Sequence, residues 1–428
     1  MIDQIPIYQF SEEHHYTLDR MENCKGMLFI TGRAGTGKST LLNVFKKITA
    51  KKYITLAPTG IAAINVKGQT IHSFFKFPFG LFSSKDYKPI SKSLLKNLDL
   101  IIIDEISMVR ADLLDHIDQI LKQQCSKDEA FGGIPLVAFG DLYQLPPVLN
   151  PEEKYLFLKQ YDNPYFFASR VFQNLVHFEM IELNQIFRQK EKYFIGLLQH
   201  IRENDMDYDL IDEINERCFI NKQTDTELSI HLCSTNRTAD FINQNKLNEL
   251  SSTLYTYQAN IQGQVLTSQY PTDAALKIKE GSQIMMIKND QSKRFVNGSL
   301  AIVTKCELDR IHVQIEGTDK PIEIEREQWE MIRYKEIQNT SSEIQSEIIG
   351  SFSQFPLRLA WAVTIHKSQG KTFEHVTIDL GSGAFEHGQV YVAMSRCKTL
   401  EGIKLTKPLQ LSDIKTDEKV NDFLRKFS

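Results

Sequence analysis

The chain has 428 residues, 42% of them hydrophobic and 24% charged, and a formal net charge of −4. This length allows about two to four domains, and the slightly acidic balance excludes a basic field over the whole molecule, although a locally basic channel is compatible with it. The scattered cysteines form no C-x-x-C pair, and no signal pattern or run of about 18 apolar residues is present, so we expect neither disulfides, zinc nor a membrane partner. An intracellular location follows, cytoplasmic or in the nucleoid if the source is bacterial.

Short apolar runs alternate with helical stretches over the first part of the chain. The predicted strands are residues 27–31, 53–57, 98–104 and 134–141. Between the last two, "ADLLDHIDQIL" repeats apolar residues at helical spacing, which predicts one buried face made of Leu113, Leu114, Ile117, Ile120 and Leu121. This alternation predicts a parallel, doubly wound α/β sheet over residues 1–175. The segments "GRAGTGKS", "PTG", "DE" and "GDLYQ" all follow predicted strands, so we expect them to converge on one cleft at the carboxyl ends.

A second strand-helix series follows, with predicted strands at 177–183, 228–235 and 374–380. We assign residues 176–274 and 358–428 to this second lobe. Between them, residues 275–357 have a different sequence pattern. Short segments rich in β-branched residues, with apolar and polar residues alternating, are separated by turn signals such as "VNGS". This pattern predicts a small antiparallel barrel inserted into the second lobe.

The segment "GRAGTGKST" follows the first predicted strand and precedes the helical stretch "STLLNVFKKI". In this G-x-x-x-x-G-K-S pattern, the backbone N–H groups of Gly35, Gly37, Lys38 and Ser39 can hold phosphate oxygens at a helix N-terminus. Lys38 can reach the β- and γ-phosphates, and the Ser39 hydroxyl can bind Mg²⁺. The alternative, a chance glycine turn, does not explain the strand before it and the helix after it.

Two adjacent carboxylates, Asp104 and Glu105, end the apolar run "LIIIDE". Asp104 is suited to hold Mg²⁺ through water, and Glu105 to polarise an attacking water. A kinase would need an acceptor pocket, and none is identifiable, so hydrolysis is favoured. In "GDLYQLPPV", Asp141 and Gln144 come at the next strand end, where Gln144 can touch the γ-phosphate.

Phosphoryl transfer also needs cations on the leaving charge, and arginines from a second domain can supply them. Arg188 in "LNQIFRQKE" and Arg396 in "YVAMSRCK" are the candidates, and both fall in the predicted second lobe. Most lone arginines form surface ion pairs. If these two reach the nucleotide, it lies between two lobes, as in a motor.

The motifs, taken together, carry a family resemblance. In order they are "GRAGTGKST", "APTGIAA", "TIHSFF", "IIIDEISMV", "GDLYQLPPV", "IFRQ", "LCSTNRTADFIN", "VNGSLAIV", "WAVTIHKSQGKTF" and "VYVAMSRCK". This ordered set, from about residue 10 to 405, resembles the helicase motifs of superfamily 1B, most of all the Pif-type DNA helicases, with RecD-like relatives.

The resemblance implies two RecA-like lobes of the P-loop NTPase class, an SH3-like barrel insertion, and an enzyme that uses ATP and Mg²⁺ to move 5′ to 3′ on single-stranded DNA and unwind tailed or forked duplex, as a monomer. The residues that would surround ATP and Mg²⁺ are Gly35, Thr36, Gly37, Lys38, Ser39, Thr40, Asp104, Glu105, Gln144, Arg188, Gly370 and Arg396. One departure is His14 in "FSEEH", where family members usually carry an adenine-reading glutamine. Adenine specificity is therefore less firmly implied than hydrolysis.

Single strands are held by backbone contacts and base stacking. The residues whose motifs match the family's strand contacts are Thr59, Gly60, His72, Ser73, Thr235, Asn236, Thr364, His366 and Lys367. Residue type alone would make His366 a core histidine. Within a predicted strand-contacting insertion at about 64–97, phenylalanines alternate with lysines: Phe74, Phe75, Phe77, Phe79 and Phe82. They form either a local core or a projecting element that stacks on bases, and the first alternative is favoured for most of them.

Two other functions stay open. An RNA or ribonucleoprotein remodeller of the same superfamily would contact 2′-hydroxyls. A nucleotide-gated switch would bind partners and unwind nothing, but Glu105, Gln144 and the paired arginines argue against it.

Overall fold

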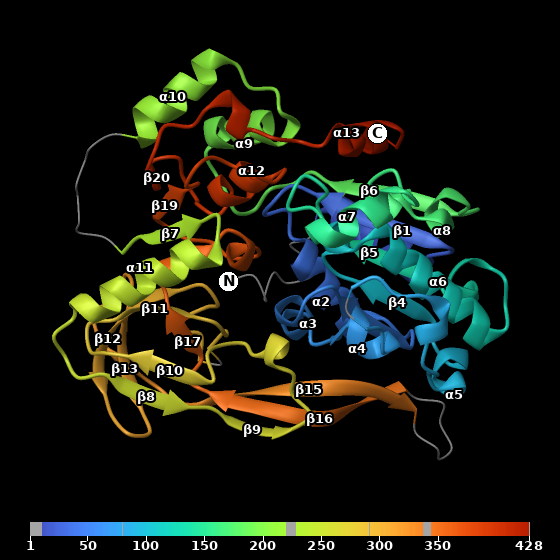
Figure 1. Cartoon of the computed structure of the whole chain (residues 1–428), viewed down its shortest axis with the longest axis horizontal. Coiled ribbons are helices and arrows are strands. Elements are labelled where there is room, and N and C mark those ends of the chain that lie inside the picture. Colours follow the sequence, from blue (N-terminus) through green and yellow to red (C-terminus); the bar gives the residue numbers. More distant parts are fainter. Residues whose placement is uncertain (1–10, 79, 220–227, 291, 337–343, 428) are drawn as a thin grey trace.

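The computed structural model describes residues 11–78, 80–219, 228–290, 292–336 and 344–427 (Figure 1). Two parallel sheets, each flanked by helices, lie side by side, and an antiparallel unit extends below both of them. No helix of the described residues is long and apolar enough to cross a membrane.

The first lobe is built on a six-stranded parallel sheet in the order β3-β2-β4-β5-β1-β6. Its strands are β1 Met27–Gly32, β2 Tyr53–Ala57, β3 Gln69–Thr70, β4 Leu100–Ile103, β5 Leu136–Phe139 and β6 Phe178–Leu183. Its helices are α1 Glu12–Glu22, α2 Lys38–Ile48, α3 Gly60–Asn65, α4 Ile71–Phe75, α5 Lys92–Lys96, α6 Ala111–Cys125, α7 Pro151–Leu158 and α8 Arg170–Gln173. The central strands β1, β4 and β5 are buried along their whole length, as continuous apolar runs require in a sheet covered on both faces.

The assignment of residues 177–183 to the second lobe is wrong. These residues form β6, which pairs in parallel with β1 from Met27 to Gly32 and so closes the edge of the first sheet. Strand-helix alternation cannot show which sheet a strand joins. The sequence pattern of β6 would be the same if it were the last strand of the first sheet or the first strand of the second.

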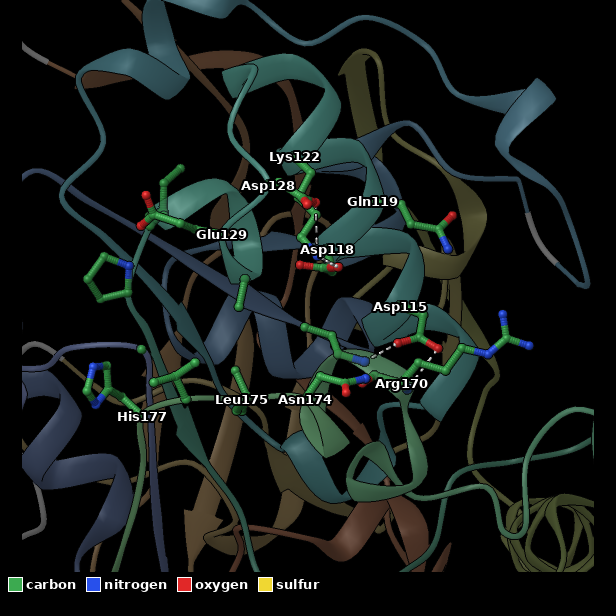
Figure 2. A pocket seen from close by; sticks show the side chains of 17 residues that line it. Asp115, Asp118, Gln119, Lys122, Asp128, Glu129, Arg170, Asn174, Leu175 and His177 are labelled. Atoms are coloured by element: carbon green, nitrogen blue, oxygen red, sulfur yellow. Dashed lines mark hydrogen bonds and ion pairs between the residues drawn. The ribbon is translucent and has the colours of Figure 1, made fainter.

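A cavity of about 570 Å³ opens at the amino-terminal ends of the first sheet's strands, beside α6 (Figure 2). Two of its carboxylates already serve the fold: Asp115 accepts hydrogen bonds from the backbone N–H groups of Arg170 and Val171, and Asp118 accepts one from Phe131 N–H. The cavity also lies at the amino-terminal edge of the sheet, whereas ligands of such sheets bind at the carboxyl edge.

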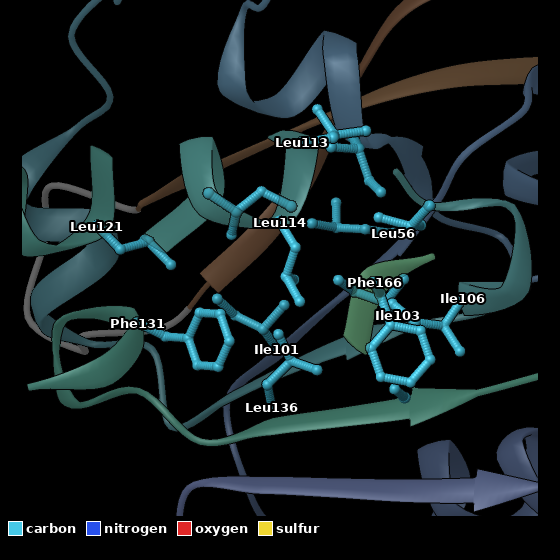
Figure 3. Close-up of a cluster of buried hydrophobic side chains, with 14 of the residues drawn as sticks. Leu56, Ile101, Ile103, Ile106, Leu113, Leu114, Leu121, Phe131, Leu136 and Phe166 are labelled. Atoms are coloured by element: carbon cyan, nitrogen blue, oxygen red, sulfur yellow. The ribbon is translucent and has the colours of Figure 1, made fainter. Parts of the chain in front are cut away.

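The core of the first lobe lies between α6 and the sheet (Figure 3). Leu114 and Phe131 pack against Ile101 and Ile103 of β4, with Phe166 alongside. The predicted apolar face of α6 is confirmed, because all five of its residues are buried.

The phenylalanines of the 64–97 segment mostly form a local core. Phe74, Phe75 and Phe77 are buried in the first lobe's core, and Phe82 stacks on His116 with ring centroids 4.2 Å apart. Phe79 lies outside the described residues. Three of these rings are therefore taken up by packing inside the first lobe.

The second lobe has a four-stranded parallel sheet in the order β18-β7-β19-β20. Its strands are β7 Ile230–Cys233, β18 Ala362–Thr364, β19 Val376–Asp379 and β20 Ile403–Leu405, and its helices are α9 Lys192–Glu203, α10 Tyr208–Cys218, α11 Asn236–Glu249 and α12 Gln389–Met394. β18 and β20 were not predicted from the sequence, because each has three residues and is too short to show periodicity.

Between α11 and β18 the chain forms antiparallel strands: β8 Tyr255–Gln258, β9 Asn260–Gly263, β10 Ala275–Ile278, β11 Gln283–Met286, β12 Leu300–Cys306, β13 Ile311–Ile315, β14 Ile322–Ile324, β15 Glu327–Glu336, β16 Ile344–Gln354 and β17 Leu357–Leu359. Five of them form one sheet in the order β14-β13-β12-β11-β17. β8 pairs with β10 and β9 with β16, so the inserted unit begins near Tyr255, before residue 275. The long β15–β16 hairpin runs beneath the first lobe (Figure 1).

The last helix, α13 Glu418–Arg425, crosses back to the first lobe. Val420 and Phe423 are buried in that lobe's core, and the Phe423 ring stacks on Phe167 with centroids 4.3 Å apart. The chain therefore joins its lobes twice, through residues 184–191 and through the segment before α13.

Candidate functional site

The phosphate-loop candidate, residues 32–40, lies between β1 and α2 at the carboxyl edge of the first sheet. Gly35 and Gly37 have φ values of 88° and 85°, which glycine adopts readily, and a Cβ on Gly35 would lie 2.6 Å from the Arg188 Cβ. Gly37 is the N-cap of α2, so the free N–H groups of that helix point into the loop. This arrangement suits a phosphate ligand.

The Lys38 side chain folds back onto this loop. Its Nζ donates to Gly32 O at 2.6 Å and to Arg33 O at 3.0 Å. Burial lowers the Lys38 pKa, and attraction from Asp141 and Glu105 opposes that shift. A buried ammonium held only by carbonyl oxygens can be reoriented toward phosphate oxygens, which are stronger acceptors. The loop and its lysine therefore fit a nucleoside triphosphate.

Asp104 and Glu105 follow β4, next to this loop. Glu105 has φ 53°, a left-handed conformation that is uncommon outside glycine and that turns the chain directly after the strand. Burial, reinforced by Glu105, raises the pKa of Asp104 to about 7. Burial also raises the pKa of Glu105, against the attraction of Lys38 and Arg396.

The described residues contain no group of three or more His, Cys, Asp or Glu side chains that could hold a metal ion. A Mg²⁺ ion does not need one, since it is usually bound by one or two carboxylates together with substrate phosphates and water. Asp104 and Ser39 fit that donor set.

Asp141 is the centre of a hydrogen-bonded network that links the lobes. The phosphate-loop N–H of Ala34 donates to the Tyr391 hydroxyl at 2.9 Å, and this hydroxyl donates to Asp141 Oδ2 at 3.3 Å. Gln144 Nε2 donates to the same oxygen at 3.1 Å and accepts at its Oε1 from Gln369 Nε2 at 3.3 Å. Because Tyr391 and Gln369 belong to the second lobe, the loops after β1 and β5 both contact it.

The other oxygen of Asp141 faces Arg202 of α9, with Nη2 to Oδ1 at 3.6 Å. Arg202 is 3% exposed and also contacts Glu182, at 3.2 Å. Its guanidinium lies 4.2 Å from the centroid of the Tyr143 ring. Asp141 raises the pKa of Arg202, and burial opposes the shift. Neither Arg202 nor Tyr391 was identified from the sequence.

Arg188 and Arg396 both lie at the cleft, but only Arg396 belongs to the second lobe. Arg188 lies in the link 184–191 after β6, so its assignment to the second lobe is corrected together with that strand. Its Nη1 donates to Ser395 O at 3.1 Å. Burial and the repulsion of Arg396 lower the pKa of Arg188 to about 9, and burial lowers that of Arg396 to about 10.

Arg396 is 1% exposed and is held by α12, where its Nε donates to Val392 O at 2.9 Å and an Nη to the Ser395 hydroxyl at 2.8 Å. The described residues include no carboxylate in an ion pair with either arginine. Two buried cations without a paired anion favour a negatively charged ligand between them.

The predicted strand contacts follow strand ends in both lobes. Thr59 caps α3 after β2, and Thr235 caps α11 after β7, each accepting a hydrogen bond from a backbone N–H at 3.2 Å. Gly60 and Asn236 are the first residues of those helices, and His72 and Ser73 lie on α4. Burial lowers the pKa of His72.

The second-lobe residues continue this edge after β18. Thr364 is buried at the end of the strand, and Lys367 is exposed on the 3₁₀ turn His366–Ser368. His366 is not enclosed in the core: its Nε2 lies 3.2 Å from Glu386 Oε2. Gly370, with φ 74° and no atom within 4 Å of a Cβ position, ends the turn.

Comparisons with known proteins identify the family. A model of the PIF1-like helicase family matches residues 11–209. The ATP-dependent DNA helicase Pif1 of Campylobacter jejuni is 32% identical over 93% of this chain and 94% of its own length. The chain spans 58–62% of the length of the PIF1 helicases of zebrafish, Xenopus laevis and human that it matches.

Two crystal structures of a Bacteroides Pif1 have a fold similar to that of this chain. The complex with ADP-AlF4 is 38% identical, with a TM-score of 0.88 over 97% of this chain and 96% of that one. The complex with single-stranded DNA is 39% identical, with a TM-score of 0.70 over 97% of this chain and 96% of that one. On sequence and on structure, this chain belongs to the PIF1-like helicase family.

Proposed function

We propose that this chain is an ATP-dependent DNA helicase that moves 5′ to 3′ on single-stranded DNA and unwinds duplex DNA. The observation that carries the proposal is the interface at Asp141, where the phosphate loop, the loop after β5 and α12 of the second lobe share one hydrogen-bonded network. A nucleotide bound there would contact both lobes at once. Strand contacts expected at the carboxyl edges of both sheets place a track beside the same interface.

In this mechanism, Gly35, Thr36, Gly37 and Thr40 shape the phosphate cradle, and Lys38 turns its ammonium toward the phosphates. Ser39 and Asp104 would hold Mg²⁺, which neutralises phosphate charge when bound. Glu105 accepts a proton from the attacking water, and burial, which raises its pKa, makes its carboxylate a stronger base. Gln144 orients groups at the γ-phosphate.

Arg188 and Arg396 stabilise the charge that develops during phosphoryl transfer. Their present partners are carbonyl and hydroxyl oxygens, so both can exchange these for phosphate oxygens without breaking an ion pair. Because Arg396 comes from α12 and Arg188 from the link between the lobes, binding both draws the lobes together. Gly370 lies on the turn that joins this region to Lys367.

Closing and opening of the cleft then shift the strand contacts of one lobe relative to the other. Thr59, Gly60, His72 and Ser73 hold the strand on the first lobe, and Thr235, Asn236, Thr364, His366 and Lys367 on the second. Such contacts go mainly to the backbone, so unwinding does not depend on base sequence. The inserted antiparallel unit is proposed to be an SH3-like barrel that guides the strand, and the helicase to act as an intracellular monomer.

The Bacteroides comparison supports a rearrangement on strand binding. At equal coverage, the TM-score of this chain is 0.88 to the complex with ADP-AlF4 and 0.70 to the complex with single-stranded DNA. We propose that the β15–β16 hairpin leaves its contacts with the first lobe when the strand binds. There, the N–H of Thr55 donates to the Tyr334 hydroxyl at 3.1 Å, and the Phe74 and Tyr334 rings meet at 6.1 Å.

The test is unwinding of one DNA duplex that carries either a 5′ or a 3′ single-stranded tail, with ATP and Mg²⁺. Unwinding from the 5′ tail alone is expected. Unwinding only from the 3′ tail would contradict the direction, and ATP turnover that ignores single strands would favour a nucleotide-gated switch. Lys38→Ala is the matched negative control, and an RNA copy of the tail separates a DNA helicase from an RNA remodeller.

A further inference from the structure

Three cations gather where the second sheet meets the inserted unit. Arg358 lies on β17, Lys367 on the turn after β18, and Lys371 just beyond that turn. We call them the seam cluster. Lys371 lies inside the motif "WAVTIHKSQGKTF" but has no role assigned above, Arg358 precedes that motif, and only Lys367 is an expected strand contact.

The seam cluster is held in place by neutral groups. An Nη of Arg358 donates to Pro271 O at 2.5 Å, and Lys371 Nζ donates to Asn297 Oδ1 at 3.0 Å. The Nε of Arg358 is buried and has no hydrogen-bond partner. Among the described residues, no carboxylate forms an ion pair with any of the three.

The charges of the cluster repel one another. Burial and then the neighbouring Arg358 lower the pKa values of both Lys367 and Lys371, the latter to about 8. Asp273 acts on Arg358, and Asp240 and Asp273 act on Lys367, only as weaker, opposing attractions. Neighbouring positive charges, a buried donor without a partner among the described residues and an exposed Lys367 together suit an anionic ligand.

We propose that the seam cluster binds a backbone phosphate of the single strand, with Arg358 and Lys371 as contacts in addition to Lys367. The inference rests on the proposed function for the identity of the anion. A phosphodiester is the natural ligand because the cluster continues the strand-contacting edge after β18, next to Thr364. One phosphate oxygen can accept a hydrogen bond from the Arg358 guanidinium while a lysine ammonium holds another.

The cluster also connects the strand to the ATP site. The Lys371 carbonyl oxygen accepts a hydrogen bond from Arg396 Nη1 at 3.5 Å, and its side chain contacts Asn297 of the inserted unit. Lys371 therefore contacts Arg396 through its backbone and the inserted unit through its side chain. The site thus joins the inserted unit, the strand and the proposed arginine finger.

The experiment measures the affinity for a labelled single-stranded oligonucleotide by fluorescence anisotropy over a series of KCl concentrations. Each contact to a single-strand phosphate contributes about 0.7 to the slope of log K against log salt. Arg358→Met should therefore reduce the slope by about 0.7, which amounts to about a fivefold loss of affinity at 0.1 M relative to 1 M salt. Arg358→Lys should restore most of it.

Two further variants make the result decisive. Arg310→Met is the matched control, since Arg310 pairs with Glu323 at 3.2 Å on the same inserted unit, and its slope should equal that of the wild type. Lys371→Gln keeps a polar contact to Asn297 and should also lower the slope, which gives a second reading if Arg358→Met does not fold. Unchanged slopes in both cluster variants, or a slope equally lowered in Arg310→Met, would overturn the inference. If the wild type itself fails to bind single strands, the proposed function fails instead.

Discussion

The Tyr391 hydroxyl offers the sharpest test of how the lobes communicate. It is the only group through which the phosphate-loop N–H of Ala34 bonds to the second lobe within the described residues, and it also donates to Asp141. Tyr391→Phe removes this oxygen and keeps the ring, which is 3% exposed and packed in the second lobe's core. The substitution therefore leaves the ring's packing intact and breaks one link between the lobes.

The size of the effect follows from the free-energy cost of the buried polar groups that lose the Tyr391 hydroxyl as a partner. A buried N–H or carboxylate oxygen that loses its partner costs about 1–3 kcal/mol. Asp141 keeps Gln144 and Arg202, so most of the penalty falls on Ala34 N–H and only in the closed arrangement, because opening exposes it to water. A penalty of about 1–3 kcal/mol lowers the closed population by roughly 5- to 150-fold, and kcat for strand-stimulated ATP hydrolysis should fall accordingly, with a smaller change in KM.

Steady-state ATP turnover with a saturating single strand measures this, with Tyr257→Phe as the control. The Tyr257 hydroxyl donates to Glu307 O at 2.7 Å inside the inserted unit, so its removal should leave turnover unchanged. If Tyr391→Phe turns over like the wild type, the hydroxyl does not couple the lobes and the reasoning from the network is refuted.

Glu105→Gln should bind a fluorescent ATP analogue normally and hydrolyse ATP about 10²- to 10⁴-fold more slowly; unchanged single-turnover rates would remove Glu105 as the base. Arg396→Ala should lose about 10³-fold or more in kcat and less in nucleotide affinity, and a pure affinity loss by titration would argue against a finger role. In Gly388→Ala, a Cβ would lie 2.3 Å from a carbonyl oxygen of the loop after β5, so strand-stimulated turnover should collapse, whereas Gly317→Ala, also at positive φ but with nothing within 4 Å, should stay active. Since the Lys371 pKa is about 8, its charge is lost as pH rises from 7 to 9, so strand affinity measured by anisotropy should fall over that range, and Lys371→Met should flatten the profile.

The sequence predicts those parts of the fold that are locally encoded. Continuous apolar runs locate β1, β2, β4 and β5, and helical spacing locates the buried face of α6, because burial on both faces or one face dictates these patterns. The wrong placement of β6 and the missed strands β18 and β20 have a common cause. Pairing partners, not local pattern, decide which sheet a strand joins, and three residues carry no measurable period.

The residues of the candidate site also divide into those that a local motif predicts and those that only long-range contacts reveal. Motif residues such as Lys38 and Glu105 were found because one loop or one strand end contains the chemistry. Tyr391 and Arg202 were missed because their contacts to Asp141 join segments far apart in the chain. A signal for Arg202 existed in the amphipathic helix α9, where it falls beside Leu198 and Ile201 on the buried face, a costly place for an unpaired cation.

The strand order of the first sheet also determines how the lobes can move. The link 184–191 leaves from β6, and α13 packs over the same edge, with its Phe423 ring 6.3 Å from that of Phe178. Both covalent crossings therefore lie at the β6 edge. At the opposite edge, the hairpin residue Tyr334 contacts β3, where its N–H donates to Gln69 Oε1 at 3.3 Å. We therefore predict that a relative movement of the lobes turns about the β6 edge and opens the molecule near β2 and β3, next to Thr59 and His72.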